Sequence, residues 1–256
     1  MQDFDVAIVG AGLAGSLAAA MLGRTGYRTV LMDPHTAYPT DFRCEKLDAA
    51  QIAVLQKTGL ASVVARAATR SNDLWIARLG HLVEKRSYDQ LDILYQDLVN
   101  SIRSAIPDNV SFMHGKTTEV SLSKDRQLVK LSNGEVLSAR LVVLASGLNN
   151  GLRHRLGITR EITSASHSIS IGFDLQPVGR PAFEFPALTY FSEGPKTRVA
   201  YLTLFPVGSS MRANLFVYRD LHDPWLRHLR QAPREALDAM MPRLQRLLGK
   251  IGRAHV

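Results

Sequence analysis

Three glycines at positions 10, 12 and 15 follow directly on a short apolar run at residues 6–9. Gly10 permits a tight turn, Gly12 lets backbone amides approach a pyrophosphate, and Gly15 lets the following helix pack closely on the strand. The first turn of that helix presents free amide groups and the positive end of a dipole, which favours phosphates. We therefore predict a phosphate-binding turn formed by Gly10, Ala11, Gly12, Leu13, Ala14 and Gly15.

Asp33 is the second candidate for chemistry. It ends the apolar segment "RTVLMD", which reads as a second strand, and it lies eighteen residues after Gly15. A carboxylate in that place can accept hydrogen bonds from the ribose of an adenosine. The order strand, glycine turn, helix, strand and acid predicts a dinucleotide site, but it does not by itself choose between NAD and FAD.

The composition is that of an ordinary globular protein able to bury a substantial core. Of the 256 residues, 46% are hydrophobic and 21% are charged. The net charge is +8, but the 31 lysines and arginines are scattered, with no run longer than two. We therefore expect no nucleic-acid partner, and we interpret the positive field as favourable to a phosphorylated cofactor.

Cysteine content and hydropathy predict a cytoplasmic protein. Cys44 is the single cysteine, so no disulfide can form within the chain. The apolar run "LAGSLAAAMLG" follows acidic residues and has 11 residues, which is too short to span a bilayer. We expect no stable membrane insertion, and the sequence leaves the oligomeric state open.

The chain after Asp33 does not continue as a simple alternation of strands and helices. Helical patterns at about 46–57 and 60–68 come first, then a hairpin pattern at 73–88 and an amphipathic helix at 91–106. Several short strands follow, with Asn133-Gly134 as a hairpin turn and a continuous apolar strand, "ARLVVLA". A β-meander inserted before a later parallel strand is typical of FAD-binding rather than NAD-binding Rossmann domains.

On these residues the chain resembles the flavoprotein monooxygenases of the para-hydroxybenzoate hydroxylase type, in the flavoprotein hydroxylase superfamily. The resemblance implies FAD as cofactor and NAD(P)H as co-substrate. It also implies three further FAD contacts: Arg43 in "DFRCEKL", Gln96 in "YQDLVNSI", and Thr117, just after "FMHG", beside the adenine.

The family's second fingerprint is Asp-Gly followed by a turn and an arginine, which contacts both the flavin and NAD(P)H. The matching stretch is "ASGLNNGLRHRLGI", in which Gly147 and Arg153 fit and Ser146 replaces the aspartate. A serine hydroxyl can keep a hydrogen bond but carries no charge. We therefore expect Ser146 and Gly147 at the cofactor, and we question whether NAD(P)H reduces the flavin by the usual route.

The sequence pattern changes after about residue 164. Alternating strands separated by Gly and Pro turns predict an antiparallel sheet that resembles the family's substrate-binding domain, followed by helices at 223–232 and 233–248. Six aromatic residues are candidates for a substrate pocket, although we interpret them first as core: Phe173, Tyr190, Phe191, Tyr201, Phe205 and Phe216.

The predicted fold class is α/β: a Rossmann-like (GR2-type) FAD-binding domain with an inserted β-meander, plus an antiparallel-sheet substrate domain, incomplete at the C-terminus. We expect the FAD-binding domain at 1–160 and the substrate-binding domain at 161–250. The family's third fingerprint, Gly-Asp near a late helix, does not follow Arg219. The final "IGRAHV" matches one translated frame of a common sequencing adapter, so residues 251–256 are interpreted as a non-native tail.

The predicted activity is that of an FAD-dependent oxidoreductase. The leading hypothesis is an NAD(P)H-dependent monooxygenase that hydroxylates an aromatic or other unsaturated small molecule through a flavin hydroperoxide. The alternatives are a flavin reductase of isoprenoid chains and a flavin- or nucleotide-binding module without turnover. The histidines show no metal-ligand spacing, so no metal is expected. The flavin performs the oxidative chemistry, and no catalytic side chain is assigned.

Overall fold

The computed structural model describes residues 1–43, 45–165, 167–177, 182–244 and 251–255. These residues form two compact units that interleave along the chain. The first unit consists of residues 1–43, 53–67 and 94–161, and the second of 44–52, 68–93 and 162–256. The functional boundaries expected at 1–160 and 161–250 stay a prediction.

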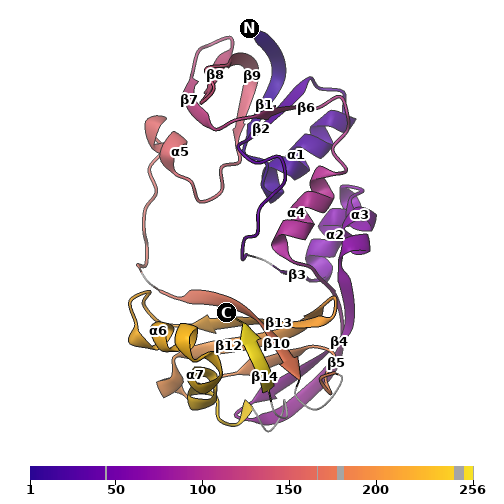
Figure 1. Ribbon diagram of the computed structural model, residues 1–256. Coiled ribbons are helices and arrows are strands. Elements are labelled where there is room, and N and C mark those ends of the chain that lie inside the picture. Colours follow the sequence, from indigo (N-terminus) through magenta and orange to yellow (C-terminus); the bar gives the residue numbers. More distant parts are fainter. Residues whose placement is uncertain (44, 166, 178–181, 245–250, 256) are drawn as a thin grey trace. The chain divides into compact units, whose positions relative to one another are not determined.

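The first unit is built on a six-stranded sheet with the strand order β6-β2-β1-β9-β8-β7 (Figure 1). Strands β6, β2, β1 and β9 run parallel, while β9, β8 and β7 form the antiparallel meander predicted from the sequence. The strands are β1 (Gln2–Val9), β2 (Thr29–Asp33), β6 (Ser111–His114), β7 (Thr117–Ser121), β8 (Gln127–Leu131) and β9 (Val136–Leu144). The α/β class and the inserted meander are therefore confirmed.

Strand β1 has apolar side chains on both faces, as expected for a parallel strand covered on both sides. Val6 and Ile8 pack into the core that contains Ala19 of helix α1 (Leu13–Arg24), and Ala7 and Val9 pack into the core on the other face. Helix α1 packs on β1, β2 and helix α4 (Tyr95–Arg103). Gly23 near the end of α1 allows close packing on the connection between α4 and β6, because a Cβ on Gly23 would lie 2.5 Å from Val110.

Helix α4 is shorter than the predicted helix at 91–106. Strand β5 (His81–Asp92) continues through Leu91 and Asp92, which pair with both β4 (Thr69–Arg78) and β3 (Lys46–Leu47). Backbone groups used in a ladder cannot also enter a helix, so the helix begins only at Tyr95. The predicted inward positions Leu98 and Ile102 are buried. The remaining helices of this part of the chain are α2 (Ala49–Lys57), α3 (Ala61–Ala67) and α5 (Gly151–Arg155).

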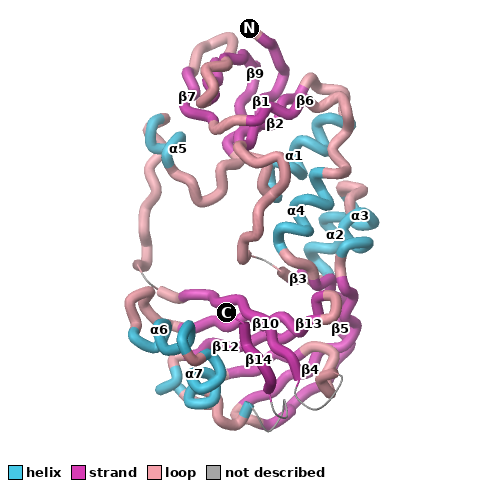
Figure 2. The backbone as a smooth tube through the Cα atoms, viewed as in Figure 1, coloured by secondary structure: helices cyan, strands magenta, loops and turns pink. Residues whose placement is uncertain are grey.

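The second unit contains an eight-stranded sheet with the order β14-β10-β13-β12-β11-β4-β5-β3 (Figure 2). Its pairs are antiparallel, except that β11 pairs parallel with β4. The predicted hairpin is confirmed as β4–β5, although the sequence did not indicate that it joins this sheet. The other strands are β10 (Ile169–Pro177), β11 (Leu188–Phe191), β12 (Val199–Val207), β13 (Ser210–Val217) and β14 (Ile251–His255).

Helices α6 (Pro224–Gln231) and α7 (Pro233–Met240) pack on each other, and both contribute to the core of the second unit. Helix α6 begins as predicted, with the Asp223 carboxylate accepting a hydrogen bond from the Trp225 N–H at 2.9 Å. The predicted helix at 233–248 is interrupted after Met240, because Pro242 disfavours the helical conformation of the residue before it, and Leu244 is again helical. Residues 245–248 lie outside the described residues.

Of the six candidate aromatic residues, Phe173, Tyr190 and Phe205 are almost completely buried in the cores of the second unit. Their interpretation as core residues is confirmed. Strand β14 pairs with β10 through its backbone. The interpretation of 251–256 as a non-native tail stays a prediction, and Val256 lies outside the described residues. None of the described helices has the length and apolar character needed to cross a membrane.

Candidate functional site

A cavity of about 810 Å³ opens in the first unit around the predicted glycine turn. It lies at the carboxyl ends of the parallel strands β1, β2 and β9, which is where open α/β sheets bind ligands. The lining residues come from the turn, from the loops after β2, β6 and β9, and from α4 and α5. They are Val9, Gly10, Gly12, Leu13, Ala14, Tyr38, Pro39, Arg43, Tyr95, Gly151, Leu152, Arg155 and residues 32–35, 115–118 and 144–149.

Two of the three glycines are required by the fold itself. Gly10 has φ of +99°, and a Cβ there would lie 2.6 Å from the carbonyl oxygen of Ala145. A Cβ on Gly15 would lie only 1.8 Å from the Gly10 oxygen. At Gly12, by contrast, the nearest atom to an added Cβ is a ring carbon of Tyr38 at 3.9 Å. Gly12 therefore leaves free space in the cavity, whereas Gly10 and Gly15 allow close packing.

The structure brings nine of the twelve predicted cofactor residues to the cavity: Gly10, Gly12, Leu13, Ala14, Asp33, Arg43, Thr117, Ser146 and Gly147. Ala11 and Gly15 do not line it, because Ala11 is buried and Gly15 packs behind the turn. Gln96 is half-buried on α4 and is also not among the lining residues. The role of each of these residues in binding stays a prediction.

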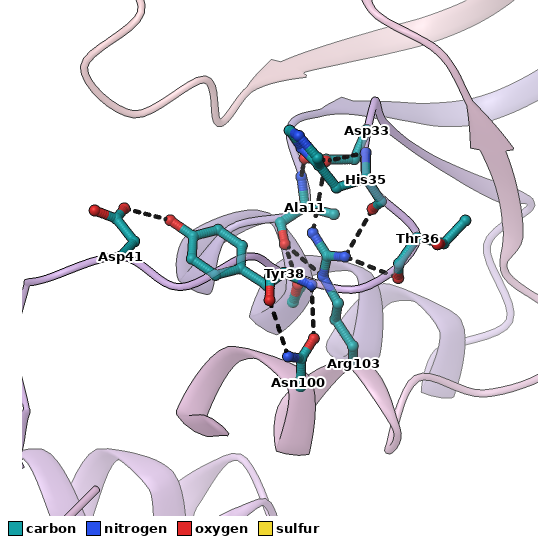
Figure 3. Close-up of polar contacts among 9 residues, drawn as sticks. Ala11, Asp33, His35, Thr36, Tyr38, Asp41, Asn100 and Arg103 are labelled. Atoms are coloured by element: carbon teal, nitrogen blue, oxygen red, sulfur yellow. Dashed lines mark hydrogen bonds and ion pairs between the residues drawn. The ribbon is translucent and has the colours of Figure 1, made fainter. Parts of the chain in front are cut away.

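Asp33 holds the backbone of the site together. One carboxylate oxygen accepts the Ala11 N–H at 2.8 Å, and the other accepts the His35 N–H at 2.9 Å (Figure 3). The second oxygen also lies 3.7 Å from Nη2 of Arg103. The sequence predicted an acceptor for a ribose, and the structure adds that this carboxylate already links the glycine turn to the loop after β2.

A chain of side chains fixes Arg43 at the cavity. The Tyr38 hydroxyl donates to Asp41 at 2.9 Å, and Nε of Arg43 donates to the same Asp41 oxygen at 2.6 Å. Burial and the adjacent Asp41 raise the pKa of Tyr38 to about 12, so the hydroxyl remains a donor at neutral pH. The Tyr38 ring makes an edge contact with Tyr95, with the ring centroids 5.4 Å apart. No sequence signal marks Tyr38 or Asp41, since an aromatic and an acid in a proline-containing loop have no specific spacing.

The loop with the second fingerprint, residues 146–153, forms its hydrogen bonds mainly within itself. The Ser146 hydroxyl donates to the Asn149 carbonyl at 2.9 Å, and Arg153 donates to the Gly147 carbonyl. Gly147 has φ of +58°, a backbone conformation that glycine adopts most easily. Ser146 therefore supplies a short turn rather than a charged group at the cavity.

One side chain at the cavity is buried and unsatisfied. Thr117 is 8% exposed, and its Oγ1 has no hydrogen-bond partner among the described residues. A buried hydroxyl without a partner is unfavourable, so a water molecule or a ligand in the cavity is expected to provide its partner. Among the described residues, no three His, Cys, Asp or Glu side chains are grouped so that they could hold a metal ion.

Comparison with known proteins now gives the class. The chain belongs to the FAD binding domain family, whose model matches residues 3–246. It is similar to 3-demethoxyubiquinol 3-hydroxylase of Escherichia coli, at 25% identity over 174 residues, which cover 61% of this chain and 44% of that protein. It is also similar to menaquinone reductase of Mycolicibacterium smegmatis, at 27% identity over 216 residues, which cover 80% and 52%.

Solved structures show the same fold. The p-nitrophenol 4-monooxygenase PnpA of Pseudomonas putida DLL-E4 matches with a TM-score of 0.74 at 17% identity, over 100% of this chain and 68% of that chain. The chain spans about half the length of the curated relatives that it matches. The predicted flavoprotein hydroxylase fold is confirmed.

The residues of the cavity fit FAD. Gly12 has no Cβ to occupy the cavity that it lines, and the unsatisfied Thr117 Oγ1 offers a hydrogen-bonding group. Arg43, Lys116 and Arg155 add positive charge to the lining, which suits a diphosphate. The described cavity therefore combines space, donors and charge of the kind that a flavin dinucleotide needs.

Proposed function

We propose that this chain holds the FAD of an NAD(P)H-dependent monooxygenase that hydroxylates an aromatic or other unsaturated small molecule. The observation that carries the proposal is the cavity at the ends of β1 and β2, formed by residues of a chain that belongs to the FAD binding domain family. The bound FAD would supply the redox chemistry, since no amino-acid side chain can transfer two electrons between a nicotinamide and oxygen. The protein's own residues bind, orient and shield it.

The glycine turn would hold the diphosphate. The backbone at Gly12, Leu13 and Ala14 lines the cavity where α1 begins, so its amides and the helix dipole favour negative charge. Arg43, fixed by Asp41, would add a second positive contact. Thr117 would donate its hydroxyl to the cofactor, which removes the penalty of leaving that group unpaired.

The substrate class is proposed from the relatives. The names of two similar proteins describe hydroxylation of a demethoxyubiquinol and oxygenation of p-nitrophenol, both of which are oxygenated six-membered rings. We infer a phenolic or quinol ring as the substrate class. Such a substrate would be recognised by an apolar pocket with few polar groups.

A reductase is the second candidate. One relative of similar identity is a menaquinone reductase, and Ser146 lacks the charge that the resemblance leads one to expect for contact with NAD(P)H. A flavin reductase of isoprenoid chains would need no activation of oxygen.

One experiment separates these functions. The FAD-loaded protein is mixed with NADH or NADPH, and bleaching of the visible flavin band is followed in air and without oxygen, with and without phenols. Faster bleaching with a phenol, and hydroxylated product in air, supports the monooxygenase. Bleaching without any hydroxylated product favours the reductase. FAD binding without bleaching by either nucleotide under any condition overturns both in favour of a binding module without turnover.

A further inference from the structure

Arg103, in the last turn of α4, joins three segments of the site. Its Nε donates to the Ala11 carbonyl at 2.8 Å, and its Nη1 donates to the carbonyls of His35 and Thr36 at 2.9 and 3.0 Å (Figure 3). Its Nη2 lies 3.7 Å from the Asp33 carboxylate. The side chain is only 9% exposed, so these contacts replace water almost completely.

The contact with Ala11 determines where an amide group points. The Ala11 carbonyl accepts from Arg103 and also from the buried Ser16 hydroxyl at 3.0 Å. A trans peptide is planar, so the C=O of Ala11 and the N–H of Gly12 point in opposite directions. Two donors that hold the carbonyl on the protein side therefore turn the Gly12 N–H away from them, and Gly12 lines the cavity.

The charge of Arg103 has a second effect. Asp33 lines the same cavity, and an uncompensated carboxylate there would repel a diphosphate. Nη2 of Arg103 has no hydrogen-bond partner in the part of the chain that the structure describes, but it is close enough to Asp33 to offset that charge. The guanidinium also polarises the peptide between Ala11 and Gly12, which makes the Gly12 N–H a stronger donor.

We propose that Arg103 is a positioning residue for the diphosphate of the cofactor: it orients the Gly12 amide and offsets the negative charge of Asp33. This inference rests on the proposed FAD site and goes beyond it, because it assigns the effect to one part of the ligand. Arg103 does not line the cavity and acts through Ala11, Gly12 and Asp33. Its influence should therefore depend on whether the ligand carries phosphates.

The test compares ligands with and without phosphate. FAD, ADP and adenosine are titrated into the 256-residue chain and into Arg103→Met, by calorimetry and flavin fluorescence. We expect Arg103→Met to bind FAD and ADP about 10- to 100-fold more weakly, as for loss of a hydrogen bond with a charged partner. Adenosine affinity should change less than about twofold. Arg103→Lys, which keeps the charge, should recover part of the affinity for ADP.

Two further variants keep the test decisive if Arg103→Met folds poorly. Ser16→Ala removes the other donor to the Ala11 carbonyl, and we expect about a 3- to 10-fold loss for FAD and ADP alone. Arg126→Met is the matched control, because Arg126 also bonds a backbone carbonyl of this unit, that of Phe4, away from the cavity. It should lower the melting temperature and leave all three affinities unchanged.

Equal losses for FAD, ADP and adenosine in the Arg103 variants would make Arg103 a general structural brace and overturn the inference. Unchanged ADP affinity in Arg103→Met would also overturn it. Failure of the proposed function gives a different result: the unaltered chain binds ADP and adenosine but does not bind FAD. The ratio of ADP to adenosine affinity in the variants would still decide the role of Arg103.

Discussion

The two units use buried polar groups in different ways. In the second unit, the Glu45 carboxylate receives two hydrogen bonds from Arg212, at 2.7 and 3.0 Å, and the Asp92 carboxylate receives hydrogen bonds from Ser71 and Gln90. At the cavity of the first unit, Thr117 has a buried hydroxyl without a partner among the described residues. These buried carboxylates are satisfied within their own unit, whereas the unsatisfied Thr117 hydroxyl lies at the cavity, where we propose that a ligand binds. The second unit also has a buried atom without a partner among the described residues, Nε of Arg219, but Arg219 does not line the cavity.

The largest expected effect is that of Gly15→Ala. Its Cβ would lie 1.8 Å from the Gly10 oxygen, so the strand and helix must separate and the turn must deform. We expect loss of more than about 3 kcal/mol of stability together with loss of FAD binding, measured by urea unfolding and flavin titration. Gly26→Ala serves as a control outside the site, since nothing lies within 4 Å of its added Cβ, although its positive φ carries a small penalty. Normal FAD affinity in Gly15→Ala would contradict the assigned turn.

The second-largest effect is expected from breaking the buried ion pair of the second unit. Arg212→Met leaves Glu45, which is 2% exposed, without its two strongest donors. Burial already raises the pKa of Glu45 despite that partner. We expect a loss of about 3 to 5 kcal/mol in urea unfolding, and recovery of part of it when Glu45→Met is added. FAD affinity of the folded fraction should not change, and a parallel loss of affinity would break the distinction between the units.

Asp92 should give the second unit a pH-dependent stability. Burial raises its pKa from 3.8 to about 6, with the hydrogen bonds from Ser71 and Gln90 opposing part of the shift. A raised folded-state pKa contributes stability that is complete below about pH 4 and is lost as the pH rises through 6. Asp92→Asn should therefore gain up to about 3 kcal/mol relative to the unaltered chain between about pH 4 and 7 in urea unfolding. A constant difference across that range would refute the assignment.

The smallest expected effect is that of removing the unsatisfied hydroxyl at the cavity of the first unit. Thr117→Val keeps the shape of the side chain and removes the unsatisfied hydroxyl. The ligand-free chain should be equally stable or more stable by about 1 kcal/mol, while FAD affinity falls about 3- to 10-fold. Thr203→Val is a suitable control, because Thr203 is buried in the second unit and its hydroxyl has a partner, the Asn214 carbonyl. That variant should lose stability and keep its FAD affinity.

The sequence predicted most reliably the features that depend on local constraints. The glycine turn could be found because Gly10 and Gly15 are required by contacts within one strand–turn–helix unit. The start of α6 behind Asp223 was predictable for the same reason, as a cap acts over a few residues.

Features that depend on distant segments were not predictable. Arg103 bonds the carbonyl of Ala11, 92 positions earlier, and an arginine at the end of a helix gives no signal of such a contact. The start of α4 was missed because β5 continues into a ladder with β3. Tyr38 and Asp41 belong to the site only because the loop folds back onto Gly12 and Arg43.

Titration of FAD into the unaltered chain and into Gly12→Ala tests the central claim most directly. The added Cβ would meet nothing nearer than 3.9 Å within the protein, so the variant should melt at the same temperature as the unaltered chain. Its methyl group would occupy part of the cavity in which we propose that the diphosphate binds. If FAD binds in this cavity, we expect saturation at one FAD per unaltered chain and binding that is at least about tenfold weaker in Gly12→Ala. Equal affinities in the two folded proteins, or no FAD binding to the unaltered chain, would contradict it.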